Sequence, residues 1–329
     1  MLQKTEVDFP EESTSLTPAV KTSKTAIAFV TRALDDCKAI RLEHLLQTIS
    51  TEFDVWVLHN HDQMEISNET QALQLQTSLD LIQQLEQRHP NLYTESQKNE
   101  AIDVFDDAIS GAAQSSFVRW VVKQHEYNHS WVMEDDVLFT GQWSHFFEAV
   151  QHKEEGMDAD IDIVATLGKR SKEWVHFYWC RIDKKYISFV EKDTKEPTNS
   201  TTVPCIQVLQ WAGLWSLARV SNRWAHYLLN DLQSGVLVGF HETVFQALEM
   251  GHADLKNMTF PSHVVGHHEA GSWGPYWDKT KCSLEMKEHQ PVEANRLYHP
   301  LKCEAYAGDR FHKLKELLVS YGWNNTREA

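Results

Sequence analysis

Residues 130–141 read "SWVMEDDVLFTG", an apolar run that ends in three consecutive carboxylates. The run "SWVM" has the composition of a buried strand, and Glu134, Asp135 and Asp136 follow it directly. Three adjacent negative charges repel one another, so we expect solvent or a metal ion to offset them. Solvation, or capping of the next helix, would explain a single Asp at such a position. Three in a row favour a metal site with oxygen ligands.

The chain before this stretch alternates between strand and helix patterns. Apolar runs predict strands, and apolar residues at i, i+3, i+4 and i+7 predict amphipathic helices. The predicted strands are 25–30, 53–59, 101–105 and 130–133, and the predicted helices are 42–49, 75–85 and 114–126. This order predicts an α/β fold of Rossmann type, with a mixed, mostly parallel sheet and helices on both faces.

The second half of the chain is less regular. Its apolar patterns predict strands over 161–167 and 174–180 and helices over 219–232 and 241–250. Residues 1–24 are polar and rich in Ser, Thr and Glu, which predicts a disordered tail. We therefore expect a single domain over 25–329, with a regular half at 25–140 and a less regular half at 141–329.

Composition excludes some classes of partner. The 329 residues carry a net charge of −16, so no basic surface is available to neutralise nucleic-acid phosphates. No apolar run has the length of a transmembrane helix, so no transmembrane segment is expected. The 5 Cys form no CxxC pair, which disfavours a zinc site of the Cys type. Their odd number fits reduced thiols, or at most two disulfides with one thiol left over.

Glycosylation sequons bear on the compartment. The chain has five N-x-S/T sequons, at Asn68, Asn128, Asn199, Asn257 and Asn324, where chance predicts about 1.6. The excess favours the Golgi lumen. Asn128 lies close to the acidic stretch, where a glycan would interfere with a site. Both the Golgi lumen and the cytoplasm therefore stay open.

Polar residues follow the other predicted strands as well. Ligands of parallel sheets bind beyond the carboxyl ends of the strands, so Thr31, Arg32 and Asp62 are expected on the same rim as the acidic stretch. Gln114 and Ser115 begin a predicted helix, whose N-terminal amides suit an anion.

The acidic stretch itself can be interpreted as a metal site. Strand alternation would direct Glu134 and Asp136 to one side and Asp135 to the other. Two carboxylates on one side suit Mn²⁺ or Mg²⁺, which are bound by carboxylates together with substrate phosphates.

The segment "SWVMEDDVLFTGQW" resembles the DXD segment of GT-A glycosyltransferases, and the order of predicted elements extends this resemblance over residues 25–270. The resemblance implies a metal-dependent enzyme that moves a sugar from a nucleotide-sugar to a carbohydrate, glycoprotein or glycolipid acceptor. It implies Mn²⁺ (or Mg²⁺) held by Asp136 and Glu134. The donor contacts that we expect are Thr31, Arg32, Asp62, Gln114, Ser115, Glu134 and Asp135.

The resemblance implies that 25–140 is the nucleotide-sugar-binding half and 141–329 the acceptor half. It implies three features in this second half. Residues 209–224 ("LQWAGLWSLARVSNRW") would form an acceptor-side strand and a Gly-containing turn into a helix. Glu242, in "GFHETVFQ", would begin a helix and act as the catalytic base. One histidine from "FPSHVVGHH" would complete the metal shell: His267 is the first choice, and His263 and His268 stay open.

Two other functions remain open from the sequence. The acidic rim would serve a nucleotidyltransferase or a phosphohydrolase equally well. Trp211 and Trp273 lie in a Trp-rich second half that could bind glycans without catalysis. The donor base, the sugar, the acceptor and the stereochemical outcome at the anomeric carbon are left open.

Overall fold

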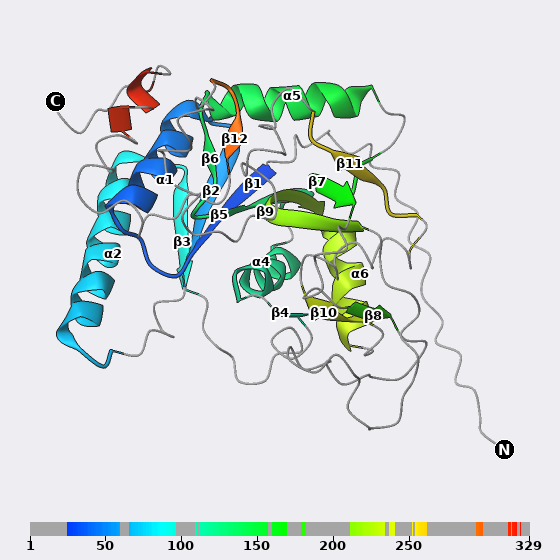
Figure 1. The fold of residues 1–329 in the computed structure, drawn as a ribbon, viewed down its shortest axis with the longest axis horizontal. Helices are drawn as coiled ribbons and strands as arrows, with labels where there is room; N and C mark the ends of the chain where they lie inside the picture. The colour runs from blue at the N-terminus through cyan, green and yellow to red at the C-terminus, as the bar shows by residue number, and fades with distance from the viewer. Residues whose placement is uncertain are drawn as a thin grey trace, which may run out of the picture.

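A computed structural model of the chain describes residues 25–59, 66–96, 109–110, 112–124, 126–156, 160–169, 179–181, 211–233, 237–240, 252, 254–261, 294–298, 315–316, 318–320 and 323. Helices and strands alternate along most of these residues (Figure 1). In chain order the elements are β1 (Thr25–Thr31), α1 (Asp36–Thr48), β2 (Phe53–His59), α2 (Glu69–Arg88), β3 (Leu92–Ser96), β4 (Ile109–Ser110), α4 (Ala112–Lys123), β5 (His129–Glu134), β6 (Leu138–Phe139), α5 (Trp143–Glu155), β7 (Ile163–Lys169), β8 (Trp179–Arg181), β9 (Trp211–Ser221), α6 (Asn222–Gln233), β10 (Leu237–Phe240), β11 (Asn257–Thr259) and β12 (Leu297–Tyr298).

A seven-stranded sheet forms the centre of the described structure, in the order β11-β7-β9-β5-β1-β2-β3. Its neighbouring strands are parallel except at β9, which runs antiparallel to both β5 and β7. The chain moves from β1 through β2 to β3 on one side, whereas β5 lies on the other side of β1. The direction of winding therefore reverses between β1 and β5.

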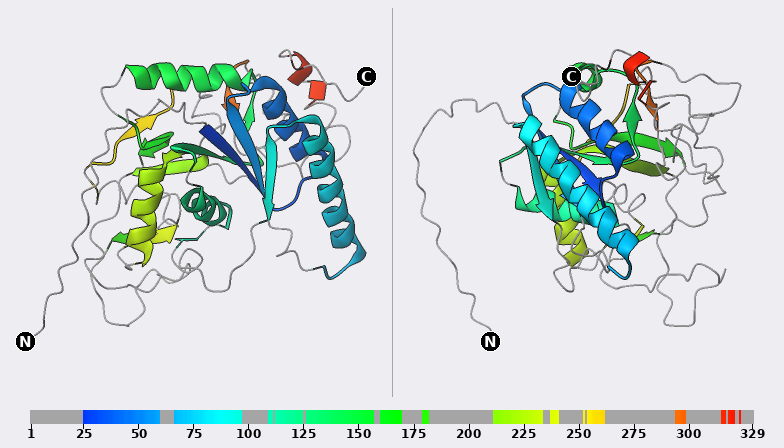
Figure 2. Two further views of the ribbon diagram at one scale, coloured as in Figure 1. Left: turned by 180° about the vertical axis from the view of Figure 1, so that it is seen from behind. Right: turned by 90° about the vertical axis from the view of Figure 1, so that its left-hand side faces the viewer.

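Helices cover both faces of this sheet (Figures 1 and 2). Successive residues of β1 alternate between the faces: Ala28 packs in a core with α4 and α6, and Phe29 packs in a core with α1, α2 and α5. The first core includes Trp120 of α4 and Trp224 of α6, both 0% exposed. Both faces of the central strands are therefore apolar, as expected for a largely parallel sheet.

Two polar caps fix where α1 and α2 begin. The Asp35 carboxylate accepts a hydrogen bond from the Lys38 amide at 2.9 Å, and the Asn68 side-chain oxygen accepts one from the Gln71 amide at 2.9 Å. Such caps satisfy amide groups that have no partner inside the helix. The start of α1 is thereby held at the end of β1.

A two-stranded sheet joins a segment near the C-terminus to the chain just after the acidic stretch. β12 pairs with β6, so that Tyr298 lies opposite Leu138. The Thr140 amide donates to the Arg296 carbonyl at 3.0 Å, and the Arg296 amide donates to the Thr140 hydroxyl at 3.0 Å. The turn that contains the acidic residues is thus held on both sides, by β5 before it and by the β6–β12 pair after it.

The predicted α/β class, with a mostly parallel sheet and helices on both faces, is confirmed. The Gly-containing turn expected within 209–224 is wrong, because Gly213 lies inside β9 and that strand runs directly into α6 at residue 222. The helix predicted over 219–232 therefore begins three residues later. The strand predicted over 101–105 and the helix predicted over 241–250 lie outside the described residues.

Two further findings concern membrane spans and cysteines. Within the part of the chain that the structure describes, no helix combines the length and the apolar character needed to cross a membrane. Cys37, in the first turn of α1, is disulfide-bonded, so at least one pair of the five cysteines is oxidised.

Candidate functional site

The acidic stretch lies at the carboxyl end of β5, beside the carboxyl end of β1. These two strands are parallel neighbours, and Val30 pairs with Glu134 at the last position of their register. Winding reverses between the same two strands. In open α/β sheets, ligands bind outside the carboxyl ends of the strands at such a reversal. The rim formed by the ends of β1 and β5 is therefore the candidate site.

The acidic residues themselves form a turn. β5 ends at Glu134, and the Val137 amide donates to the Glu134 carbonyl at 3.2 Å, so that Asp135 and Asp136 are the central residues of the turn. Strand alternation, from which the orientation of these three side chains is predicted, ends at Glu134, so it does not determine the orientation of Asp135 and Asp136. Asp136 is buried at 3% exposure, whereas Glu134 and Asp135 are partly exposed.

Asp135 is held by two residues from the β1–α1 segment. Its Oδ2 accepts a hydrogen bond from the Thr31 hydroxyl at 2.7 Å and lies 3.0 Å from Lys38 Nζ. Lys38 Nζ also donates to the Ala33 carbonyl at 3.0 Å. These contacts tie the acidic turn to the loop between β1 and α1, across the point where winding reverses.

The environment of Asp135 opposes its ionisation. Burial raises the pKa of Asp135 above its ordinary value, and the nearby Asp136 carboxylate adds to this rise. The Lys38 ammonium and the Thr31 hydroxyl act in the other direction, since both stabilise the ionised carboxylate. Asp135 is therefore engaged in holding the turn, and Glu134 and Asp136 are the two further carboxylates that the turn provides.

These two carboxylates match part of a metal site. Mn²⁺ and Mg²⁺ take oxygen ligands and are often bound by one or two carboxylates together with substrate phosphates and water. Within the described ranges, no group of three or more His, Cys, Asp or Glu side chains is arranged to hold a metal ion. Among the described residues the turn supplies two such carboxylates, Glu134 and Asp136, so any further ligands of a cation here would come from the rest of the chain, from water or from a phosphate-bearing ligand.

The structure brings together some of the residues predicted from the sequence. Thr31, Glu134, Asp135 and Asp136 lie at the same rim, and the exposed Arg32 directly follows Thr31. Gln114 and Ser115 lie in the first turn of α4. The remaining predicted site residues, Asp62, Glu242 and His267, and the alternatives His263 and His268, lie outside the described residues, as does Trp273.

Lys38 is a site residue that sequence reasoning missed. It lies in the first turn of α1, where a positive charge is unfavourable because the helix dipole is positive at that end. A cation at this position is therefore a sign that a carboxylate lies nearby. Asp35, three residues earlier, lies 3.7 Å from Lys38 Nζ, and the fold brings Asp135 closer, to 3.0 Å.

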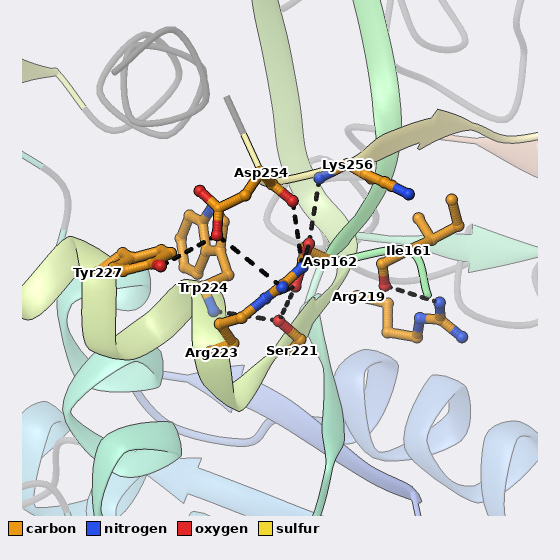
Figure 3. A network of polar contacts seen from close by, with 9 residues as sticks. All are labelled: Ile161, Asp162, Arg219, Ser221, Arg223, Trp224, Tyr227, Asp254 and Lys256. Carbon is orange, nitrogen blue, oxygen red and sulfur yellow. Dashed lines mark hydrogen bonds and ion pairs between the residues drawn. The ribbon is translucent and has the colours of Figure 1, made fainter. Parts of the chain in front are cut away.

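A second polar cluster, shown in Figure 3, lies at the opposite ends of the strands. Asp162, immediately before β7, accepts hydrogen bonds from the Ser221 hydroxyl at 2.6 Å, from Arg223 Nε at 3.0 Å and from the Lys256 amide at 3.1 Å, and it also forms an ion pair with Arg223. These donors lower the pKa of Asp162, although burial opposes the shift. The carboxylate is satisfied by protein donors from β9, α6 and the segment before β11, so we interpret this cluster as structural.

A cavity of about 310 Å³ lies far from the acidic turn. It is lined by the end of α1 at Gln47 and Thr48, by Ser144 of α5 and by Trp323. Thr48 is ten residues after Lys38 along α1, which corresponds to about 15 Å. The cavity and the candidate site are therefore separate.

Comparison with known proteins relates this chain to others at the level of fold. A galactosyltransferase LgtC, solved in complex with donor and acceptor sugar analogs, has 10% identity and a TM-score of 0.47, over 92% of this chain and 98% of that one. Mouse xyloside xylosyltransferase 1, in its apo form, has 10% identity and a TM-score of 0.42, over 84% and 96%. A 4-diphosphocytidyl-2C-methyl-D-erythritol synthase from Anaerococcus prevotii has 12% identity and a TM-score of 0.39, over 75% and 91%.

These likenesses concern the fold alone. Their identities of 10–12% and TM-scores below 0.5 carry no argument about activity, and the α/β assignment rests on the sheet order and strand directions described above. No family model matches the chain, and no curated protein matches it.

Proposed function

We propose that the protein is a glycosyltransferase that binds a nucleotide-sugar at the rim formed by the ends of β1 and β5. The proposal is that it transfers the sugar to a carbohydrate, glycoprotein or glycolipid acceptor. The observation that supports this most is the position of the acidic turn, at the carboxyl ends of two parallel strands between which winding reverses. The resemblance of "SWVMEDDVLFTGQW" to a DXD segment supports the choice of a nucleotide-sugar as the ligand.

In this proposal the residues of the acidic turn have different roles. Glu134 and Asp136 would hold Mn²⁺ or Mg²⁺, which when bound supplies positive charge to a diphosphate leaving group. Asp135, held by Thr31 and Lys38, would keep the turn in the conformation that presents these two carboxylates. The exposed Arg32 would contact a donor phosphate, with Asp62, Gln114 and Ser115 as further donor contacts.

Two residues outside the described part of the chain complete the proposal. Glu242 is proposed as the base that takes a proton from the acceptor hydroxyl. His267 is proposed as a further metal ligand, which as a neutral imidazole would bind more weakly once the pH falls below the ordinary pKa range of histidine.

A thermal-shift screen tests donor binding. UDP-, GDP- and CMP-linked sugars are each added with and without Mn²⁺, and the melting temperature is measured, because a ligand that binds the folded state raises it. We expect one nucleotide-sugar to raise the melting temperature only with Mn²⁺, and Asp136→Asn to abolish that rise while it leaves the fold intact. An Asp136→Asn protein with an unchanged Mn²⁺-dependent rise would contradict the metal assignment.

The other functions predict different results, which phosphate-release assays and oligosaccharides added to the same screen would measure. A nucleotidyltransferase or phosphohydrolase would turn over phosphate substrates without any sugar acceptor. A glycan-binding protein without catalysis would respond to oligosaccharides and ignore nucleotides. A protein that no nucleotide-sugar stabilises, with or without Mn²⁺, would contradict the proposed function.

The role of Glu242 is tested by kinetics with the donor that the screen identifies. Glu242→Gln keeps the shape of the side chain but cannot accept a proton as a base does. We expect kcat to fall on the order of 10²–10⁴-fold while donor affinity is preserved. A kcat close to that of the unmodified enzyme would rule out this role.

A further inference from the structure

Three of the five sequons lie in described segments, and in all three the Asn side chain is exposed. These residues are Asn68, Asn128 and Asn257. Asn257 belongs to β11, whose pattern of exposed, buried, exposed residues directs Asn257 and Thr259 to solvent and Met258 to the core. β11 is also an edge strand of the described sheet, which a bulky group would shield from pairing with another chain.

Asn68 is compatible with modification in spite of its role as a helix cap. Its side-chain oxygen accepts the hydrogen bond from the Gln71 amide, whereas a glycan is attached to the side-chain nitrogen. The cap and the modification therefore use different atoms of the same amide. Figures 1 and 2 show the start of α2, which Asn68 caps, projecting beyond the ends of the neighbouring strands.

Asn128 lies far from the acidic turn, which corrects the expectation from sequence that a glycan there would interfere with the site. It precedes the first residue of β5, and Glu134 is the last, so the two are about 20 Å apart along the strand. Asn257 lies at the same ends of the strands as Asn128, since it pairs with Ile163, the first residue of β7. Glycans at Asn128 and Asn257 would leave the rim open.

The oxidised state of Cys37 is an independent sign of the same environment. Disulfides persist in oxidising compartments, which include the lumen where N-glycosylation takes place. We infer that Asn68, Asn128 and Asn257 carry N-linked glycans and that the protein passes through that lumen. This inference does not depend on the proposed function.

The modification needs a sugar donor and an enzyme from the host cell. The side-chain amide nitrogen attacks the first sugar carbon of a lipid-diphosphate-linked oligosaccharide. A nitrogen–carbon bond forms, the carbon–oxygen bond to the diphosphate breaks, and the amide loses one proton. The lipid diphosphate leaves, and no oxidant or reductant is required.

The test uses the full-length protein produced from its own coding sequence in a eukaryotic host. The purified protein is treated with peptide N-glycosidase in ¹⁸O-labelled water, which converts a glycosylated Asn to labelled Asp, and peptides are sequenced by mass spectrometry. We expect labelled Asp at positions 68, 128 and 257. Unlabelled Asn at all three positions would overturn the inference, and unlabelled Asn at one would remove that site.

Matched variants separate glycan loss from loss of structure. Thr70→Ala destroys the first sequon without touching the Asn68 cap, whereas Thr70→Ser keeps the sequon and is the control. Asn128→Gln and Asn257→Gln remove the other two sequons. Each destroyed sequon should abolish the label at its own position and increase gel mobility by one step, and Thr70→Ser should do neither. A label at Asn68 that persists in Thr70→Ala would overturn N-glycosylation there.

Discussion

Lys38 is the residue whose contacts say most about how the acidic turn is built. Its ammonium group lies 3.0 Å from Asp135 Oδ2, and both side chains are 21% exposed, so solvent screens the pair only in part. The Thr31 hydroxyl binds the same carboxylate oxygen from the end of β1. A half-buried carboxylate that loses its cation keeps the cost of burial without the compensating attraction.

Replacement of Lys38 should therefore weaken the turn. We expect Lys38→Met to lower the free energy of unfolding by about 1–2 kcal/mol, because Asp135 would stay partly buried without its cation. Lys38→Arg, which keeps the charge, should recover part of this loss. Urea denaturation of both variants measures the effect. A Lys38→Met protein as stable as the unmodified one would show that the ion pair contributes nothing.

The residues of the site differ in how far sequence could predict them. The acidic stretch was found because its charges follow an apolar run directly, which is a local pattern. The contact between Thr31 and Asp135 joins residues 104 positions apart, and it exists only because β1 and β5 are neighbours. A single sequence contains no local pattern for such a contact.

At the scale of elements, the sequence predicted the strands that are continuous apolar runs and the helices whose apolar residues recur at helical spacing. β1, β2 and β5 are short apolar runs, and α1 and α2 carry apolar residues at helical spacing. β3 was missed because it is a short edge strand with only one buried residue, Leu92. α5 was missed although Trp143, Phe146, Phe147 and Val150 have helical spacing, because Gln142 before it forms no side-chain cap and so gives no pattern typical of a helix start.

Replacement of Gly141 tests how tightly the connection between β6 and α5 is packed. A Cβ atom at this position would lie 2.2 Å from Asn295 Oδ1 and 2.9 Å from a ring carbon of Phe139. We expect Gly141→Ala to lower the free energy of unfolding by about 1–3 kcal/mol, because the connection must move to make room. The midpoint of urea denaturation measures this change.

Two variants serve as controls for Gly141→Ala. Gly156→Ala, at the end of α5, meets only the Lys153 carbonyl at 3.6 Å and should change stability by less than about 0.5 kcal/mol. Asn295 has a φ of 57°, which glycine adopts readily, so Asn295→Gly should relieve the clash when it is combined with Gly141→Ala. If the double variant is no more stable than Gly141→Ala alone, the clash is not the cause.

At the scale of the whole molecule, buried titratable groups should make the protein sensitive to acid. Burial lowers the pKa of His44 from 6.5 to about 4, although a hydrogen bond with the Gly141 backbone opposes the shift. As the pH falls from 6.5 to 4, the unfolded chain takes up a proton that the folded protein does not. Stability should therefore fall across this window, by about 3 kcal/mol from His44 alone.

Asp162 adds a second pH range, below that of His44, over which the protein loses stability. The pKa of Asp162 is lowered below 3.8, so its contribution to stability is present above that value and is lost as the pH falls through the folded-state pKa.

Melting temperatures measured from pH 7 to pH 3 should show a first decline between 6.5 and 4. His44→Gln should flatten this first decline. Equal slopes in the two proteins would show that His44 does not titrate as described.

The position of β9 has a consequence for the order in which the molecule can be assembled during synthesis. β9 lies between β5 and β7 in the sheet, yet it follows both of them in the chain. Until residues 211–221 have been made, β5 and β7 each present an unpaired edge, and such edges promote aggregation. β5, which ends in the acidic turn, therefore gains its second neighbouring strand only after β9 has been synthesised. A nascent chain that stalls before residue 211 should depend on chaperones to stay in solution.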